Sequence, residues 1–259
     1  MSSACVFLMY HELEMPGRAL RDSEAGYVRY VVREEEFRRQ MEWLRQSGRK
    51  AVNVGEALTF SAEKYIALTF DDGSETDCLA AANILREHGF GATFYVTVGY
   101  IAKQGCMNAA QLRELLGLGF EIGCHAMTHT YLTDLDAAGL RREIADAKHE
   151  LEDVIGREVR HFSCPGGRCD AHVVKMAHDA GYQSLVTSRV QVNSASTAPF
   201  ALGRIAIQRD TTLSAFQEIC QGKRLWKLQL KSQLQNTAKN LLGNRVYDRA
   251  RARALKGGR

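Results

Sequence analysis

The sequence has few chain breakers and no long apolar run, and these absences exclude several classes of protein. Only 3 of its 259 residues are proline, and no low-complexity run appears, which excludes a disordered scaffold. No stretch approaches the roughly 18 to 20 apolar residues of a membrane-spanning helix. No repeat of about 20 to 50 residues indicates a solenoid. The remaining composition, 45% hydrophobic and 25% charged, is typical of a globular protein that buries a full core.

The N-terminus also lacks the features of a secretory signal. No basic segment opens the chain, and the apolar run from Val6 to Met9 is too short for a signal sequence. The 7 cysteines are odd in number and form no CxxC pair. Even the close pair Cys164 and Cys169 therefore favours reduced thiols over a disulfide or a zinc clip. We expect a cytoplasmic protein if Met1 is the true start.

Charge is spread unevenly, which divides the chain into a main domain, residues 1–221, and a basic tail, residues 222–259. The tail holds 11 Lys or Arg and one acid, whereas acids exceed bases in the main domain. Apolar residues recur in the tail at helical spacing, beginning with Trp226, Leu230 and Leu234. One interpretation is a helix packed on the domain. The other is a basic amphipathic helix on the anionic inner face of a membrane. Nucleic-acid binding is less favoured, because no aromatic platform accompanies the charge.

Apolar, strand-like runs alternate with amphipathic helical stretches through the main domain. This alternation predicts an α/β fold, a distorted (β/α) barrel of about seven parallel strands. We expect helices over Arg33–Gln46 and Asp136–Ile155, and a helix that begins at the capping residue Asn108. The expected strands are Cys5–Tyr10, Ile66–Phe70, Ala92–Val96, Phe120–Cys124, His161–Cys164, Gln183–Val186 and Leu202–Ile207.

Two clusters that follow expected strands have the composition of a metal site. Asp71 and Asp72 stand side by side, which is electrostatically unfavourable unless a cation relieves it. His125 and His129 are four residues apart, so both rings face the same side if this segment is helical. Ala126 excludes the zincin pattern HExxH. Each cluster alone also fits an ordinary turn or ordinary histidines, but together they offer two imidazoles and a carboxylate, as hydrolytic metal sites require.

A third cluster, from His161 to Arg168, contains a Pro-Gly-Gly turn. Such a turn lets the backbone approach a ligand closely, and the N–H of Gly166 can point at a developing oxyanion. A plain tight turn is the alternative interpretation.

The order of these motifs resembles the polysaccharide deacetylase family, carbohydrate esterase family 4 with the NodB-type homology domain. The sequence TFDDG (residues 69–73) is followed by HxxxH and then by F-x-x-P-x-G, and the resemblance covers about residues 5 to 210. The resemblance implies that Asp71 is the general base. It also implies that Asp72, His125 and His129 bind Zn²⁺, or another divalent ion such as Co²⁺ or Ni²⁺.

The chain departs from the family pattern at three positions. Ser163 stands where many members have an arginine that braces the catalytic Asp, and Gly166 replaces a frequent aromatic. No histidine follows His178, so the usual acid is missing. The segment ending in His11 resembles the opening motif of the permuted poly-N-acetylglucosamine deacetylase branch, which makes His11 the candidate acid; a hydrogen-bonded strand-end histidine is the alternative. We further hypothesise that Arg204 supplies the missing bracing charge.

These residues lead us to expect a hydrolase that removes N-acetyl groups from N-acetylhexosamine units of an exopolysaccharide or its lipid-linked precursor. An amidase or esterase acting on a small non-sugar acyl substrate is one alternative. A non-catalytic sugar-binding domain is another, although the intact set of two acids and two histidines argues against it.

Overall fold

The structure is a computed structural model, and it describes residues 4–60, 64–223, 225–226 and 228–230. Among these residues, no helix combines the length and the apolar character that crossing a membrane requires. Most of the predicted basic tail, from residue 231 onward, lies outside the described residues.

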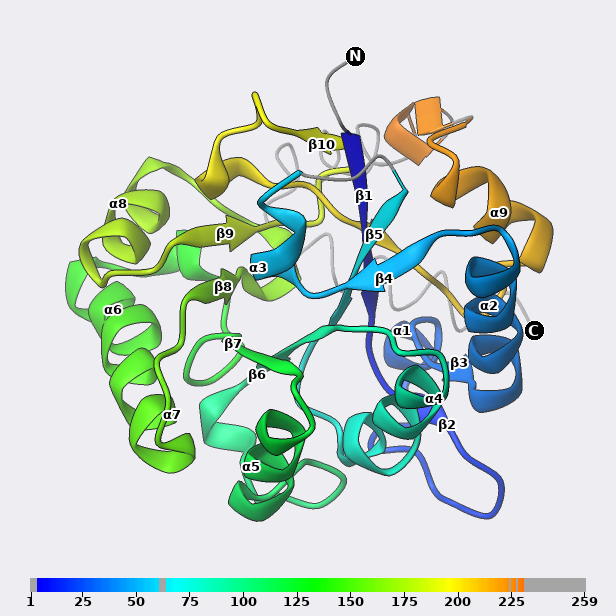
Figure 1. Cartoon of the computed structure of the whole chain (residues 1–259). Coiled ribbons are helices and arrows are strands. Elements are labelled where there is room, and N and C mark those ends of the chain that lie inside the picture. Colours follow the sequence, from blue (N-terminus) through cyan, green and yellow to red (C-terminus); the bar gives the residue numbers. More distant parts are fainter. Residues whose placement is uncertain (1–3, 61–63, 224, 227, 231–259) are drawn as a thin grey trace.

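A curled, nine-stranded sheet occupies the middle of the protein (Figure 1). Its strands run in the order β10-β1-β5-β6-β7-β8-β9, with β11 paired to β1 and β4 paired to β5, and only β10 is antiparallel to its neighbour. An isolated parallel bridge between Val186 and Leu202 links β9 to the segment that leads into β11, so the sheet curls back toward β1. The strands of this sheet are β1 (Ala4–Tyr10), β4 (Lys50–Val52), β5 (Tyr65–Phe70), β6 (Thr93–Val96), β7 (Glu121–Cys124), β8 (His161–Ser163), β9 (Ser184–Val186), β10 (Asn193–Ser194) and β11 (Ile205–Ala206). A separate parallel pair is formed by β2 (Leu13–Glu14) and β3 (Val32–Arg33).

Helices cover the outside of this sheet, and Figure 1 shows α2, α4, α5, α7 and α8 around its rim. The helices are α1 (Ala25–Val28), α2 (Glu34–Gln46), α3 (Val54–Ala57), α4 (Ala82–Glu87), α5 (Ala109–Gly117), α6 (Ala137–Arg141), α7 (Ala147–Ile155), α8 (Ala171–Asp179) and α9 (Leu213–Cys220). A π-helical segment, Asp77–Ala81, precedes α4, and a second one, Arg142–Asp146, joins α6 to α7.

The helices begin and end where local side-chain chemistry favours it. The Asn108 side chain accepts hydrogen bonds from two backbone amides of α5, and Gln111 completes the capping box. Asp136 caps α6, and Gly156 ends α7 in the left-handed conformation with φ 68°. The expected helices therefore form, although the one over 136–155 contains a π-helical segment.

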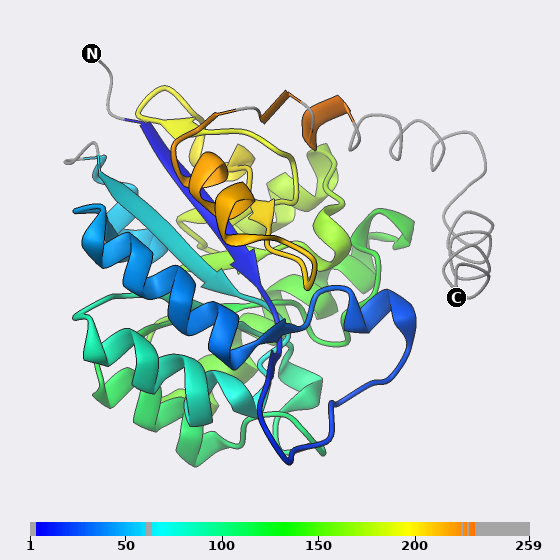
Figure 2. The same ribbon diagram turned by 90° about the vertical axis from the view of Figure 1, so that its right-hand side faces the viewer.

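Alternation along the strands separates the helix-covered core from the interior of the barrel. In β1, Val6 and Leu8 belong to the core beneath the helices, whereas Cys5 and Phe7 pack inside with Ala67 of β5. Figure 2 shows β1 and β5 running side by side. Because side chains alternate along a strand, residues two and four positions after Ala67 continue along the interior face.

A polar layer closes the interior at the amino ends of the strands. The Thr93 hydroxyl donates to Glu121 Oε2 at 2.5 Å, and His161 Nε2 lies 3.2 Å from Glu121 Oε1. Above this layer, Tyr95 packs against Gly123, where any Cβ would overlap the tyrosine ring. The interior is thus filled, and chemistry is left to the carboxyl ends of the strands, as in other α/β barrels. His161, part of the third motif, belongs to the closed end.

The expected fold class is confirmed by the curled parallel sheet and its flanking helices. The last expected strand, Leu202–Ile207, is shorter than predicted. Only Ile205–Ala206 pairs with β1, because Leu202 bridges to β9 instead. The three-residue strand β4 was not predicted.

Candidate functional site

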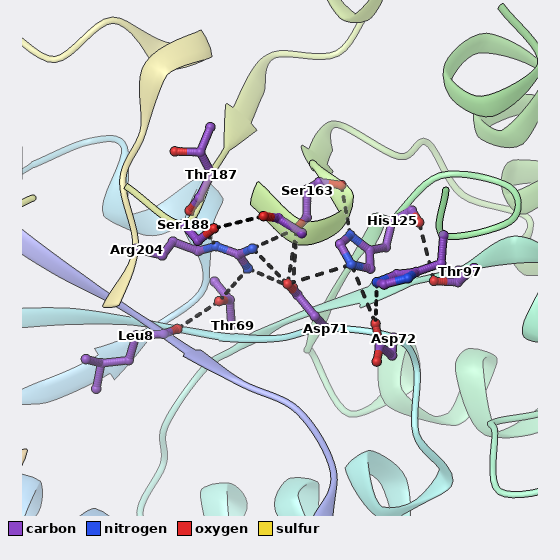
Figure 3. A network of polar contacts seen from close by, with 12 residues as sticks. Leu8, Thr69, Asp71, Asp72, Thr97, His125, Ser163, Thr187, Ser188 and Arg204 are labelled. Atoms are coloured by element: carbon purple, nitrogen blue, oxygen red, sulfur yellow. Dashed lines mark hydrogen bonds and ion pairs between the residues drawn. The ribbon is translucent and has the colours of Figure 1, made fainter. Parts of the chain in front are cut away.

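Asp71, the first residue after β5, is held by a buried arginine that directly precedes β11, two strands away. Arg204 Nη1 donates to Asp71 Oδ1 at 2.7 Å, and Nη2 donates to Oδ2 at 2.8 Å. The same guanidinium donates to the hydroxyls of Thr69 and Ser163 and to the Thr187 carbonyl. Figure 3 shows Asp71 between this arginine and His125. Arg204 is 1% exposed, so both partners of this forked pair are shielded from water.

The arginine determines the charge state of Asp71. Burial alone raises the pKa of this carboxyl, but the positive charge of Arg204 and its hydrogen bonds outweigh burial, with help from His125. The pKa of Asp71 therefore lies below its ordinary value, and the side chain is ionised at neutral pH. Ser163 occupies the position where the arginine of the third motif was expected, and its hydroxyl lies 3.3 Å from Asp71 Oδ2.

Asp72, His125 and His129 converge on one point beside Asp71. Asp72 Oδ1 lies 3.5 Å from His125 Nε2 and 3.3 Å from His129 Nε2. Among the described residues, these three are the only group of this kind, and one ligand atom from each lies within 4.8 Å of the others. The structure therefore brings together the same three side chains that the sequence analysis grouped as candidate metal ligands.

The donor atoms of this cluster suit a divalent ion. Asp72 Oδ1 is buried and has no hydrogen-bond partner among the described residues. The Nδ1–H of His125 donates to the Ser163 carbonyl at 2.8 Å, which leaves Nε2 with its lone pair. Burial lowers the pKa of His125 to about 4, so the ring is neutral at pH 7. One carboxylate oxygen and two imidazole nitrogens form a donor set that zinc accepts.

The two histidines meet through a loop, so the expectation that they share a helical turn is wrong. Residues 125–131 form no helix, and Ala126 and His129 adopt left-handed backbone conformations with φ 63° and 62°. Asp72 has φ 77°. Non-glycine residues in this region are strained, and such strain gathers at functional sites.

Glu143, in the π-helical segment before α7, fixes this loop. Its Oε2 accepts hydrogen bonds from the backbone amides of Met127 and Thr128 at 3.0 and 2.8 Å, and its Oε1 accepts one from the Thr128 hydroxyl at 2.6 Å. The side chain is 5% exposed. Sequence reasoning missed Glu143; an acid beside the apolar stripe of a predicted helix was the available signal.

His11 follows β1 and lies near the same cluster. The backbone amide of Asp71 donates to the carbonyl of Tyr10, which sets the end of β1 beside the end of β5. Burial lowers the pKa of His11, and the nearby charges of Asp72 and Asp71 act in the opposite direction. Its Nδ1 is buried without a hydrogen-bond partner among the described residues, and its ring packs against Tyr30 at a tilt of 38°, with centroids 5.1 Å apart.

The Pro-Gly-Gly turn follows β8 directly. Gly166 has φ 62°, and a Cβ there would meet Tyr131 Cε1 at 2.7 Å. Gly167 has φ 69°, and a Cβ there would overlap the Ser188 side chain. Tyr131 therefore occupies the space beside Gly166, where many family members have an aromatic side chain in the turn itself.

Comparison with known proteins supports a family assignment. Residues 61–185 match the family model described as polysaccharide deacetylase. They form a polysaccharide deacetylase domain. The matched residues include Asp71, Asp72, His125, His129 and Gly166.

Individual relatives agree with this assignment. The chain is 27% identical over 215 residues to YxkH of Bacillus subtilis, named as a polysaccharide deacetylase, and the match covers 81% of this chain and 73% of that protein. It is 35% identical over 127 residues to the peptidoglycan-N-acetylglucosamine deacetylase of Bacillus cereus, across 49% of this chain and 57% of that enzyme.

Solved structures share the fold of the deacetylase domain and its flanks. The deacetylase PplD of Streptococcus pyogenes has a TM-score of 0.75 at 20% identity, covering 85% of this chain and 99% of PplD. IcaB of Ammonifex degensii has a TM-score of 0.72 at 22% identity, covering 85% of this chain and 97% of IcaB. His11 and Arg204 lie outside residues 61–185, yet both reach the same site, because β1 and β11 pair beside β5.

Proposed function

We propose that this protein is a metal-dependent hydrolase that removes N-acetyl groups from N-acetylhexosamine units of an exopolysaccharide or its lipid-linked precursor. The main support is the convergence of Asp72, His125 and His129 next to an ionised Asp71 that accepts two hydrogen bonds from Arg204. The names of relatives, among them a peptidoglycan-N-acetylglucosamine deacetylase and chitooligosaccharide deacetylases, favour an N-acetylated sugar.

In this proposal, Asp72, His125 and His129 hold Zn²⁺, which would supply Lewis-acid polarisation of the acetamide carbonyl. Co²⁺ or Ni²⁺ could replace it. Asp71 is the general base and takes a proton from the attacking water at one carboxylate oxygen. Arg204 keeps Asp71 ionised and fixes its orientation, a task that an arginine of the third motif performs in many family members.

His11 and Gly166 complete the proposed site. The lowered pKa of His11 makes its protonated ring a stronger acid, which suits proton donation to the departing sugar amine. The N–H of Gly166 stabilises the developing oxyanion, because glycine lets the backbone approach the reacting carbonyl.

Aromatic side chains around the site support a sugar substrate over a small acyl compound. Tyr30 packs at a tilt against His11, and Tyr100 stacks on His129 with centroids 6.4 Å apart. Tyr131 lies against Gly166. All three tyrosines are half-buried, and each offers an apolar ring with a polar tip, which suits the mixed surface of a sugar.

The proposal is tested by acetate release from N-acetylglucosamine oligomers. We expect release by the zinc-loaded protein, loss after chelation and recovery when zinc is restored. Asp71→Asn should lower turnover about 10²- to 10⁴-fold while zinc is retained, whereas His125→Ala should lose both zinc and turnover.

Three outcomes would contradict the proposal. Release that chelation leaves unchanged would exclude metal dependence. Hydrolysis of a small acetanilide without hydrolysis of the oligomers would favour the non-sugar amidase. Oligomer binding without acetate release would favour the sugar-binding domain.

A further inference from the structure

Arg21 makes a contact with the metal cluster that no motif predicts. It lies in the segment of residues 15–24 between β2 and α1, and its Nη2 donates to Asp72 Oδ2 at 2.8 Å. The other oxygen of the same carboxylate, Oδ1, faces His125 and His129 and has no hydrogen-bond partner among the described residues. The two oxygens of Asp72 are therefore divided between the guanidinium and the imidazole pair.

The position of Arg21 is itself closely defined. Its backbone amide donates to both carboxylate oxygens of the buried Glu12, at 3.2 and 3.1 Å. Its guanidinium carbon lies 5.0 Å from the ring centroid of Tyr27 and 5.4 Å from that of Tyr100. The Tyr27 hydroxyl donates to the same Glu12 at 2.6 Å. These contacts hold the guanidinium in a defined orientation. Through its hydrogen bond to Oδ2, the guanidinium in turn orients the Asp72 carboxylate.

Arg21 is also a cation among buried acids. Its charge acts on both Asp72 and Asp77, and each of these side chains is less than 7% exposed. Asp72 carries a left-handed backbone, with φ 77°. A side chain on such a backbone needs partners to hold it in place, and Arg21 is the partner on the side away from the histidines.

We propose that Arg21 is a positioning residue of the metal centre: it binds Asp72 through Oδ2 and so presents Oδ1 to the ion as a single-oxygen ligand. This inference rests on the proposed function, because it assumes that the cluster binds a divalent ion. It assigns to the segment 15–24 the task of orienting Asp72, a ligand in the loop that follows β5.

Two physical effects of Arg21 on zinc affinity have opposite signs, and this makes the proposal testable. A guanidinium near the ion repels it, so removing the charge alone would tighten zinc binding. Losing the orientation of Asp72 would weaken it, and loss of an outer hydrogen-bond partner typically costs about 10- to 100-fold in metal affinity. We infer that orientation dominates.

The chain offers a matched control in Arg18. Arg18 lies in the same segment and pairs with Glu75, three residues beyond Asp72, with both side chains about one quarter exposed. It tethers the segment to the same stretch of chain without contacting a ligand of the cluster. A general loosening of the segment would therefore affect the Arg18 and Arg21 variants alike.

The experiment measures zinc affinity by competition with a chromophoric chelator for wild type, Arg21→Ala, Arg21→Lys and Arg18→Ala. Circular dichroism and thermal unfolding without zinc confirm that each variant is folded. We expect Arg21→Ala to bind zinc about 10- to 100-fold more weakly. Arg21→Lys, which keeps the charge but loses the planar fork, should also bind more weakly, and Arg18→Ala should match wild type.

Equal or tighter binding by Arg21→Ala would overturn the inference and leave Arg21 as a nearby charge. Equal losses in the Arg18 and Arg21 variants would assign a tethering role instead. Wild-type affinity in Arg21→Lys would likewise overturn the inference, because it would show that the planar guanidinium is not needed to orient Asp72. Absence of zinc binding by the wild-type protein would refute the proposed function itself, which is a different result from any of these.

Discussion

Asp71 has to be both ionised and buried, and these two requirements oppose each other. Its pair with Arg204 shows how the protein satisfies both. A carboxylate that accepts a proton must be ionised beforehand, yet it lies 2% exposed in the barrel interior. Arg204 keeps the buried carboxylate ionised, because its two Nη atoms each donate a hydrogen bond to one carboxylate oxygen. The cost is a second buried charge, which is tolerated because five hydrogen bonds surround the guanidinium.

Replacing Arg204 with methionine should therefore change both stability and the pH dependence of activity. Without the cation, burial favours the neutral acid, so the pKa of Asp71 rises. Since the base must be ionised, the acid limb of the kcat/KM profile should move to higher pH. Loss of one partner of a buried pair should also lower the free energy of unfolding by about 3–5 kcal/mol. Urea unfolding and a pH–rate profile measure these two effects.

Arg209 provides the control for this substitution. Its pair with Glu14 has N and O atoms 2.8 Å apart, but both side chains are about one third exposed. Arg209→Met should cost at most about 1 kcal/mol and leave the pH profile unchanged. A pH profile of Arg204→Met that matches wild type would remove Arg204 from its bracing role.

At the scale of secondary-structure elements, the site consists of short segments that follow strand ends. The loop after β7 brings its histidines together through two left-handed residues and three hydrogen bonds to Glu143. The turn after β8 reverses the chain through two successive glycines of positive φ. Neither segment has a regular pattern of apolar residues, so its shape depends on the neighbours that surround it.

We expect alanine to lower stability much more at Gly167, in the turn after β8, than at Gly156, at the end of α7. Gly156 and Gly167 have nearly the same φ, 68° and 69°, but a Cβ at Gly156 meets nothing within 4 Å. Gly156→Ala should therefore cost only about 1–2 kcal/mol for the left-handed backbone. Gly167→Ala should cost more and should lower activity, because its Cβ would overlap Ser188 beside the site. Thermal unfolding and acetate release compare the two, and equal costs would show that the turn adapts.

On the scale of the whole molecule, an exposed apolar pair lies at the start of the basic tail. Leu225 is buried, whereas Trp226 and Leu230 are 60% and 51% exposed. Single exposed apolar residues are common, but a tryptophan and a leucine four positions apart in a basic segment suit a membrane interface. We propose that residues 222–259 associate peripherally with anionic membranes, which would bring the site to lipid-linked glycans.

Flotation with vesicles tests this proposal. The full chain should float with vesicles that contain anionic lipid and should not float with neutral ones, and salt should weaken the association. A chain ending at Gln221 should stay in the soluble fraction. Because that truncation also removes the buried Leu225, the double variant Trp226→Ser and Leu230→Ser in the full chain is the better control. Equal flotation of wild type and this variant would assign the surface no membrane role.

The sequence alone predicted seven of the nine strands of the main sheet and grouped Asp72, His125 and His129. Strand periodicity is local, and parallel strands bring their carboxyl ends to one edge, so the residues directly after β5 and β7 lie at the same edge of the sheet, with only β6 between the two strands. The helical turn expected for the histidines was wrong, because contacts with Glu143, not local propensity, shape that loop.

Only the tertiary structure decided the partners that come from far along the chain. Arg204 is 133 residues from Asp71, and Arg21 is 51 residues from Asp72. Arg204 was only a hypothesis from its place near the last strand, and Arg21 gave no signal, since one arginine in an irregular segment resembles any other. Their positions depend on how β11 returns to β1 and how residues 15–24 pack against Tyr27 and Tyr100. Such packing depends on many residues at once, and no short motif encodes it.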